Sequence, residues 1–234
     1  MNAMNAKRKP SSGDRKKRVM IVDDHPMMRK GMTLLVNQQK ELMVCCEAAA
    51  GAEAMELVDA SAPDLAIIDV SLEGSSGLEL IKDLRARHPE VLVLVLSMHD
   101  ESVYAERILR AGARGYVMKS VGAKTILSAI RQVLKGGIFL SQRMSEFVLG
   151  SLTENLPRMS HAPIHSLTDR EFEIFELVGE GKTVRQIAKL LHLSSKTVDT
   201  HRRNIMEKLH FDNVTGLLRH AVRWTELQNT GDVD

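Results

Sequence analysis

Cysteine and long apolar runs are scarce in this sequence of 234 residues, and it has no net positive charge outside the N-terminus. The longest uninterrupted apolar run, Val91 to Leu96, is far shorter than the roughly 20 residues that a membrane-spanning helix needs. No apolar core follows the basic residues at the N-terminus, so we expect no secretory signal. These absences exclude a membrane role and favour a cytoplasmic protein.

The only two cysteines, Cys45 and Cys46, are adjacent. They lie in an expected strand, Leu42 to Cys46, where neighbouring side chains point to opposite faces. We therefore expect free thiols with a structural role, as suits a reducing compartment. A redox or metal role is the minor alternative, because no second cluster of ligands accompanies them.

Positive charge is concentrated at the N-terminus. The formal net charge is +2, but residues 1 to 18 hold seven basic side chains and one acidic one, a balance of +6 that leaves −4 for the remainder. Any affinity for nucleic acid must therefore come from local arrangement. We predict that the basic tail, residues 1–17, is disordered and solvated, with sequence-independent contact to DNA or RNA as the alternative.

The apolar content of 44% is enough for two small domains. Between residues 18 and 140, five short apolar runs alternate with helical periodicity, which predicts a doubly wound, flavodoxin-like domain with a five-stranded parallel sheet. Residues 141–165 have weak periodicity and are predicted to be a linker, with a short helix from Gln142 to Leu152. Residues 166–227 are purely helical and predict a four-helix domain with a helix-turn-helix unit, and residues 228–234 form a second disordered tail.

Polar side chains follow four of the expected strands. They are Asp23 and Asp24, Asp69, Ser97 and Lys119. Because the carboxyl ends of parallel strands open onto one crevice, we expect these residues to share a pocket. The alternative is that each is an ordinary polar residue at a strand end.

Clustered carboxylates repel one another unless a cation is present. Mg²⁺ suits Asp23, Asp24 and Asp69 because it prefers oxygen ligands and keeps several waters. The backbone carbonyl of Ser71, two residues beyond Asp69, is a further candidate ligand.

Asp69 is then the natural nucleophile towards a phosphoryl donor, since an aspartyl carboxylate can form an acyl phosphate. Lys119 would neutralise the phosphoryl oxygens, and Ser97 would donate a hydrogen bond to one of them. His25 and His99 flank the pocket, and we interpret them as solvated loop residues, with an influence on dephosphorylation as the alternative.

Two groups of motifs carry a resemblance to known proteins. Residues 18 to 140 resemble a response-regulator receiver domain through the motifs Val22-Asp23-Asp24-His25-Pro26, Ile67-Ile68-Asp69, Leu96-Ser97 and Met118-Lys119. The later residues resemble a LuxR-type DNA-binding domain through Leu167-Thr168-Asp169-Arg170-Glu171, Gln186-Ile187-Ala188 and Thr197-Val198-Asp199-Thr200-His201. Together they are similar to the NarL/FixJ family. Three positions depart from the family pattern without removing a pocket group: Glu73, Met98 and Val184.

The resemblance implies a transcription regulator rather than an enzyme. A sensor histidine kinase would phosphorylate Asp69 with Mg²⁺ as cofactor, and Ser97 would move towards the phosphoryl group. The ring of Tyr116 would then fill the vacated space from the surface. We expect the phosphorylated protein to be a homodimer on a double-stranded DNA operator. The fourth helix, with Leu217, Leu218 and Ala221, either supplies the dimer contact or belongs to the core.

The helix from about Ser195 to Leu209 is the expected DNA-reading element. Its inward face is apolar, and its opposite face carries Lys196, Asp199, Thr200, Arg203 and Glu207. In a major groove Arg203 can pair with guanine, and Thr200 can touch a thymine methyl group. Asp199 either accepts from a cytosine amino group or repels phosphate and so tightens selectivity. The remaining candidates bind the DNA backbone: Ser194, Ser195, Lys196 and Thr197 at the helix start, and Arg202 and Lys208 on its flanks. The alternative is a solvated amphipathic helix.

Two rival functions remain. A phosphatase or phosphotransferase would also use Asp69 as nucleophile, but Ser71 stands where its general acid is expected, and no substrate cap is apparent. A protein adaptor would use the helical domain to bind protein, and a salt-dependent DNA shift would separate it from a DNA reader.

Overall fold

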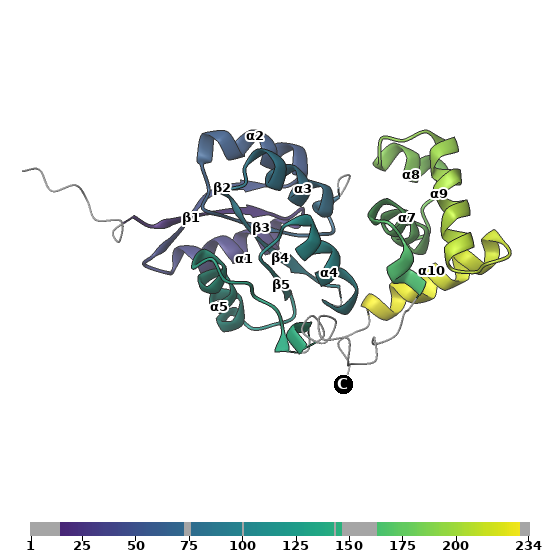
Figure 1. Ribbon diagram of the computed structural model, residues 1–234. Coiled ribbons are helices and arrows are strands. Elements are labelled where there is room, and N and C mark those ends of the chain that lie inside the picture. The colour runs from purple at the N-terminus through teal and green to yellow at the C-terminus, as the bar shows by residue number, and fades with distance from the viewer. Residues whose placement is uncertain (1–14, 73–75, 100, 143, 147–162, 230–234) are drawn as a thin grey trace, which may run out of the picture.

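The computed structural model describes residues 15–72, 76–99, 101–142, 144–146 and 163–229 (Figure 1). Five strands form one parallel sheet in the order β2-β1-β3-β4-β5. The strands are β1 (Lys17–Val22), β2 (Leu42–Ala48), β3 (Leu65–Ile68), β4 (Leu92–Ser97) and β5 (Gly115–Met118). The sheet confirms the predicted doubly wound α/β fold.

Five helices alternate with these strands and cover both faces of the sheet. They are α1 (Pro26–Asn37), α2 (Gly51–Ser61), α3 (Gly77–Arg87), α4 (Glu101–Ala111) and α5 (Ala123–Leu134). Alternate strand residues point to opposite faces, so Val19 and Ile21 of β1 pack in one apolar core with α1 and α5, while Met20 packs in the other with α2, α3 and α4. Because the strands are buried on both faces, their sequences read as continuous apolar runs.

The pairing of β1 with β2 contains a register shift. Val19 pairs with Val44, whereas Met20 pairs with Cys46, so Cys45 is an extra residue on β2. Such a bulge disrupts the alternation of side chains. The two cysteine Sγ atoms lie 3.8 Å apart, and the predicted placement of these side chains on opposite faces is therefore wrong.

The C-terminal part is helical, as predicted. A short 3₁₀ turn, η1 (Pro163–Ser166), is followed by α7 (Asp169–Gly179), α8 (Val184–Leu190), α9 (Ser195–Lys208) and α10 (Val214–Asn229). Thr168 and Glu171 form a capping box at the start of α7. Between α8 and α9 the chain turns through His192, whose φ of 52° lies in the left-handed region. The α8-turn-α9 segment is the predicted helix-turn-helix unit.

Several sequence predictions fall outside the described residues. These are the basic tail before residue 15, Glu73, most of the linker and of the helix from Gln142 to Leu152, and the tail after residue 229. Residues 142 and 144–146 are helical. The domain limits at 18–140 and 166–227 stay predictions. Within the described ranges, no helix combines the length and the apolar character that a bilayer crossing requires.

Candidate functional site

The carboxyl edge of the sheet brings the predicted pocket residues together. Val22 and Ile68 are register partners on β1 and β3, so Asp23 and Asp69 emerge side by side. Ser97 and Met118 are partners on β4 and β5, which places Lys119 immediately beyond Ser97. The backbone N–H of Asp69 donates to the Val22 carbonyl at 2.8 Å, and that of Lys119 to the Ser97 carbonyl at 2.7 Å. The sheet register therefore fixes the pocket.

Lys119 joins two of the carboxylates. Its Nζ lies 2.7 Å from Asp23 Oδ2 and 2.6 Å from Asp69 Oδ2, and all three side chains are 5% exposed or less. Burial raises the pKa of the Asp69 carboxyl above its ordinary value, against the effect of the nearby ammonium group. Burial also opposes the charge of Lys119, but its hydrogen bonds to Asp23 and Asp69 outweigh that effect and raise its pKa.

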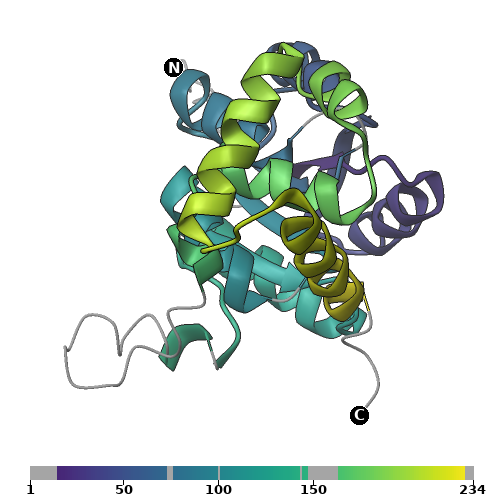
Figure 2. The same ribbon diagram turned by 90° about the vertical axis from the view of Figure 1, so that its right-hand side faces the viewer.

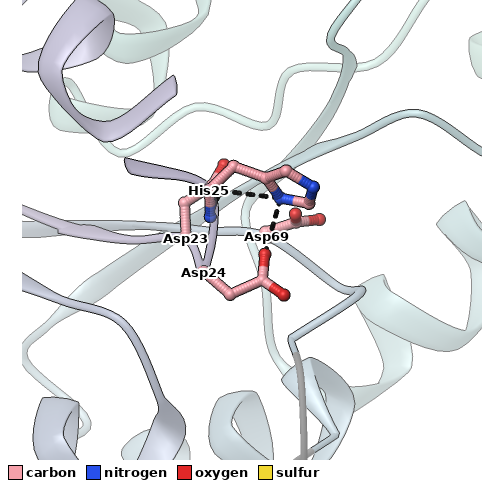
Figure 3. Close-up of side chains that lie close together, drawn as sticks. All are labelled: Asp23, Asp24, His25 and Asp69. Atoms are coloured by element: carbon pink, nitrogen blue, oxygen red, sulfur yellow. Dashed lines mark hydrogen bonds and ion pairs between the residues drawn. The ribbon is translucent and has the colours of Figure 1, made fainter. Parts of the chain in front are cut away.

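A cluster of potential metal ligands lies beside this ion pair (Figure 3). Asp23, Asp24, His25 and Asp69 each offer an atom, and these atoms lie within 4.8 Å of one another. His25 Nδ1 is 2.6 Å from Asp24 Oδ1, and its side chain is 69% exposed, as expected for a solvated loop histidine. The carboxylates of Asp23, Asp24 and Asp69 form an oxygen-rich set of donors within this cluster, which fits Mg²⁺.

The loop after β3 is tied to Asp69. The backbone N–H of Ser71 donates to Asp69 Oδ1 at 3.1 Å, so Ser71 lies next to the carboxylate cluster. The role of its carbonyl as a metal ligand stays a prediction.

His99 differs from the predicted solvated histidine. Its ring Nε2 lies 2.7 Å from Ser71 Oγ, and its backbone N–H donates to Ser97 Oγ at 3.1 Å. Burial, followed by the charge of Lys119, lowers the pKa of His99 to about 4, so its ring is neutral at neutral pH. Ser97 itself is fully buried. His99 thus links the Asp69 loop to the end of β4.

The ring of Tyr116 is already inside the protein. Only 1% of this residue is exposed, and its hydroxyl donates to the His99 carbonyl at 2.7 Å. The expectation that the ring starts at the surface is therefore wrong, because this hydrogen bond holds it in the core.

An aromatic series continues from the pocket to the helical domain. The His99 ring stacks on Tyr104 of α4 with ring centroids 4.7 Å apart. Tyr104 in turn meets Phe172 of α7 edge to face at 5.2 Å. Phe172 contacts Trp224 of α10 in the same manner at 5.5 Å. Rings from α4, α7 and α10 therefore connect the two domains.

Arg107 supplies the polar part of this domain contact. Its guanidinium donates to the Leu167 carbonyl at 2.8 Å and to the Ile164 carbonyl at 3.0 Å, and it lies 4.6 Å above the Phe172 ring. It also pairs with Asp169 at 3.2 Å. Burial opposes the charge of Asp169, but bonds to Lys82 of α3 and to Arg107 prevail and lower its pKa. Sequence reasoning missed Arg107, because its partners lie some 60 residues further along the chain.

The predicted DNA-reading face of α9 is exposed. All five of its predicted polar residues lie at the surface: Lys196, Asp199, Thr200, Arg203 and Glu207. Ser194 caps the helix, with its Oγ accepting from the Thr197 N–H at 3.0 Å. In Figures 1 and 2, α9 lies on the side of the helical domain that faces away from the sheet.

Two of the predicted flank residues have other partners. Lys208 Nζ lies 2.6 Å from the buried carboxylate of Glu171, which is part of the α7 capping box. Arg202 pairs with Asp199 at 3.4 Å and is only 18% exposed. Lys208 therefore has a structural role that its position in the sequence did not reveal.

Comparisons with known proteins agree with this architecture. Residues 19–131 match the family described as response regulator receiver domain, and residues 165–221 match bacterial regulatory proteins of the luxR family. The chain is similar to the oxygen regulatory protein NreC of Staphylococcus carnosus (strain TM300), with 31% identity over 210 residues that cover 88% of this chain and 97% of that protein. The transcriptional regulatory protein DegU of Brevibacillus brevis is 29% identical over 230 residues, 92% of this chain and 98% of that protein.

A solved structure shares the fold. RcsB of Salmonella enterica serovar Typhimurium, bound to promoter rprA in the presence of the phosphomimetic BeF3⁻, is 23% identical. It superposes with a TM-score of 0.67 over 88% of this chain and 98% of that chain. At this identity the likeness supports the fold.

Replacing Lys119 by methionine should lower the free energy of unfolding at pH 7 by about 3 kcal/mol, because two buried carboxylates lose their ammonium partner. Loss of that charge raises the folded-state pKa of Asp69 further. Protonation of Asp69 at lower pH then removes its repulsion with Asp23 and stabilises the folded variant. The deficit relative to the parent protein should therefore shrink as the pH falls from 7 to 5. Urea unfolding at both pH values measures it.

The matched control is Lys124→Met, which removes an exposed ammonium group on α5 and should change the unfolding free energy by less than about 0.5 kcal/mol. A deficit of Lys119→Met that is equal at pH 5 and pH 7 would contradict the role assigned to the ion pair.

Proposed function

Because the chain belongs to the response regulators that join a receiver domain to a LuxR-type DNA-binding domain, we propose that it is a transcription regulator switched by phosphorylation of Asp69. One observation carries the assignment of the residue: Lys119 bridges Asp69 to Asp23 beside a cluster of further carboxylates. This arrangement pairs a nucleophile with a fixed positive charge, as phosphoryl transfer needs. A sensor histidine kinase would be the donor, and the cytoplasm the compartment.

Asp23, Asp24, Asp69 and the Ser71 carbonyl would hold Mg²⁺. The bound ion would neutralise charge that develops on the phosphoryl oxygens. The oxygen donor set supports this ion over zinc or copper, which favour nitrogen and sulfur ligands.

In the reaction, an oxygen of the Asp69 carboxylate attacks the phosphorus of a phosphohistidine. The P–N bond breaks, the imidazole keeps the electron pair, and an aspartyl phosphate forms. The Lys119 ammonium then pairs with a phosphoryl oxygen in place of a carboxylate oxygen. Ser97 Oγ accepts a hydrogen bond from His99, so its own proton is available to donate to a second phosphoryl oxygen.

The signal would reach the helical domain through the aromatic series. If Ser97 turns towards the phosphoryl group, it loses the His99 backbone N–H, and the Tyr116 hydroxyl loses its fixed acceptor on the same residue. The His99 ring stacks on Tyr104, which contacts Phe172. Phosphorylation would therefore loosen the α4–α7 contact. A coupling of a few kcal/mol is the usual size for such an effect.

The output would be DNA binding by α9 of a homodimer. Two copies would read half-sites about one helical turn, roughly 34 Å, apart. Leu217 and Ala221 of α10 are fully buried in the domain core, whereas Leu218 is 43% exposed and Val214 45% exposed. Of the residues predicted for the dimer contact, Leu218 is thus the one that a partner helix could cover.

The family is that of DNA-binding transcription regulators, and we propose that this chain acts as one rather than as a phosphatase. The Ser71 hydroxyl lies two residues beyond Asp69 and contacts the neutral His99 ring. Neither the Ser71 hydroxyl nor the neutral His99 ring is acidic enough to act as the general acid that protonates a leaving alkoxide. Mg²⁺-dependent turnover of small phosphoesters would favour the enzyme instead.

Incubation with Mg²⁺ and a small phosphoryl donor such as acetyl phosphate should add one phosphoryl group to the parent chain, detected by intact mass. Asp69→Asn should remain unlabelled, because an amide is not a nucleophile of this kind. Asp83→Asn, an exposed carboxylate on α3, is the matched control and should label like the parent. Labelling of Asp69→Asn at the parent rate would place the acceptor elsewhere.

Trp224 is the single tryptophan of the chain and packs against Phe172 and Phe175 at 5.5 and 5.6 Å. Addition of Mg²⁺ and beryllofluoride should shift its fluorescence emission, because loosening of the α4–α7 contact changes the surroundings of Phe172. Arg107→Ala should show part of that shift without any phosphate mimic. An unchanged parent spectrum, or an equal shift in Asp69→Asn, would argue against the coupling.

For DNA binding, Arg203→Ala should cost about 1–3 kcal/mol at one base position of a selected duplex. Lys196→Ala should weaken binding to all sequences and reduce the salt slope by about one. Lys124→Ala in α5, an equal loss of charge far from α9, serves as the control. Binding titrations at several salt concentrations measure all three, and parent-like behaviour of both α9 variants would exclude this docking.

A further inference from the structure

The adjacent cysteines lie at an irregular point of the sheet. They sit on β2, the edge strand beside β1, at the register shift that leaves Cys45 as the extra residue. Their Sγ atoms are 3.8 Å apart, and both residues are only partly buried. Two thiols are therefore in van der Waals contact at the surface of the domain.

The two sulfurs differ in character. A hydrogen bond with the Cys45 thiol lowers the pKa of Cys46 to about 6. Burial opposes this shift, whereas a hydrogen bond with the Ser61 side chain and the charge of Arg18 add to it. The same contact raises the pKa of Cys45. Cys45 Sγ also donates to the Val19 carbonyl at 3.4 Å, a contact that only the protonated thiol makes. Cys46 is thus the more acidic of the two thiols and the better nucleophile, and Cys45 is the resolving thiol.

A basic hollow opens beside the pair. Its volume is about 500 Å³, and its lining includes Arg18 and Ser61, the two neighbours of Cys46. Lys16 adds further positive charge, whereas Arg15, also in the lining, is paired with Asp64 at 3.4 Å. Such a surface attracts anionic reagents.

We propose that Cys45 and Cys46 form a reversible oxidation site for anionic low-molecular-weight disulfides of the glutathione disulfide class. The Cys46 thiolate attacks one sulfur of the disulfide, and the first glutathione leaves as a thiolate. Cys45 then gives its proton to water or buffer, attacks the Cys46 sulfur and releases the second glutathione. The protein pair loses two electrons to the reagent and becomes a disulfide between neighbouring residues.

The position of the pair favours this ring closure and its reversal. Neighbouring Cα atoms are about 3.8 Å apart, below the usual 4.4–6.8 Å range for disulfides, so the bond is strained and readily reduced. Cys45 has no register partner on β1, and β2 has no strand on its other side within the described part of the chain. The peptide can therefore adjust with little loss of pairing. A structural zinc site is a poorer fit, since it needs four ligands.

The test exposes the full-length protein to glutathione disulfide and follows its intact mass. The parent chain should lose two hydrogen atoms without gaining a glutathione, and a reducing agent should reverse the change. Cys45→Ser should stop at one glutathione adduct, on Cys46, whereas Cys46→Ser should stay unmodified over the same time. A stable adduct on the parent chain, or a disulfide between two chains on a non-reducing gel, would overturn the proposal.

Two rate measurements complete the test. At pH 6, iodoacetamide should label Cys46 about tenfold faster in the folded protein than in urea, because the gain in thiolate outweighs the lower nucleophilicity of an acidic thiol. Oxidation by glutathione disulfide should exceed that by neutral hydroxyethyl disulfide and should slow with added salt. Equal alkylation rates in the two states would overturn the assigned nucleophile, and equal oxidation rates for the two disulfides would overturn the assigned class of reagent.

Discussion

The ammonium group of Lys119, held between two buried carboxylates, is the interaction on which the receiver half depends. Asp23 and Asp69 end neighbouring strands, and their charges would repel each other without a cation between them. The ammonium group satisfies both oxygens at hydrogen-bond distance. A phosphoryl group on Asp69 would compete for the same ammonium group. The contact that stabilises this pocket would therefore also be the one that the proposed phosphorylation rearranges.

The contact between the receiver and the helical domain combines apolar and polar interactions. Arg107 is only 10% exposed, and taking such a charge out of water is costly unless it is paired. Two backbone carbonyls, Asp169 and the face of Phe172 supply the compensation. Since these partners belong to the helical domain, moving that domain would leave the guanidinium with fewer of them. These partners of Arg107 therefore favour the docked arrangement of the helical domain.

Features that depend on periodicity were predictable from the sequence, whereas features decided by one local geometry were not. Strand ends place Asp23 and Asp69 together in any parallel sheet with these runs, so that part of the pocket was predictable. The bulge at Cys45 was not, because a single extra residue leaves no mark in an apolar pattern. The direction of the Tyr116 ring depends on one rotamer and on one carbonyl, that of His99.

Lys208 illustrates a different limit of sequence reasoning. Its charge and its place on α9 are typical of a DNA-backbone contact, but the structure pairs it with Glu171. That carboxylate also completes the start of α7. A pattern along one helix cannot reveal a partner on another helix 37 positions earlier in the chain.

The direction in which α9 points has a consequence for control. The polar residues of α9 are exposed while the α4–α7 contact is made, and α9 lies at the front of Figure 2. The receiver therefore does not cover the face that we propose binds DNA. A single copy would then be competent for weak DNA encounters before any signal arrives. The signal would then set the spacing between the α9 helices of two copies, rather than uncover either helix.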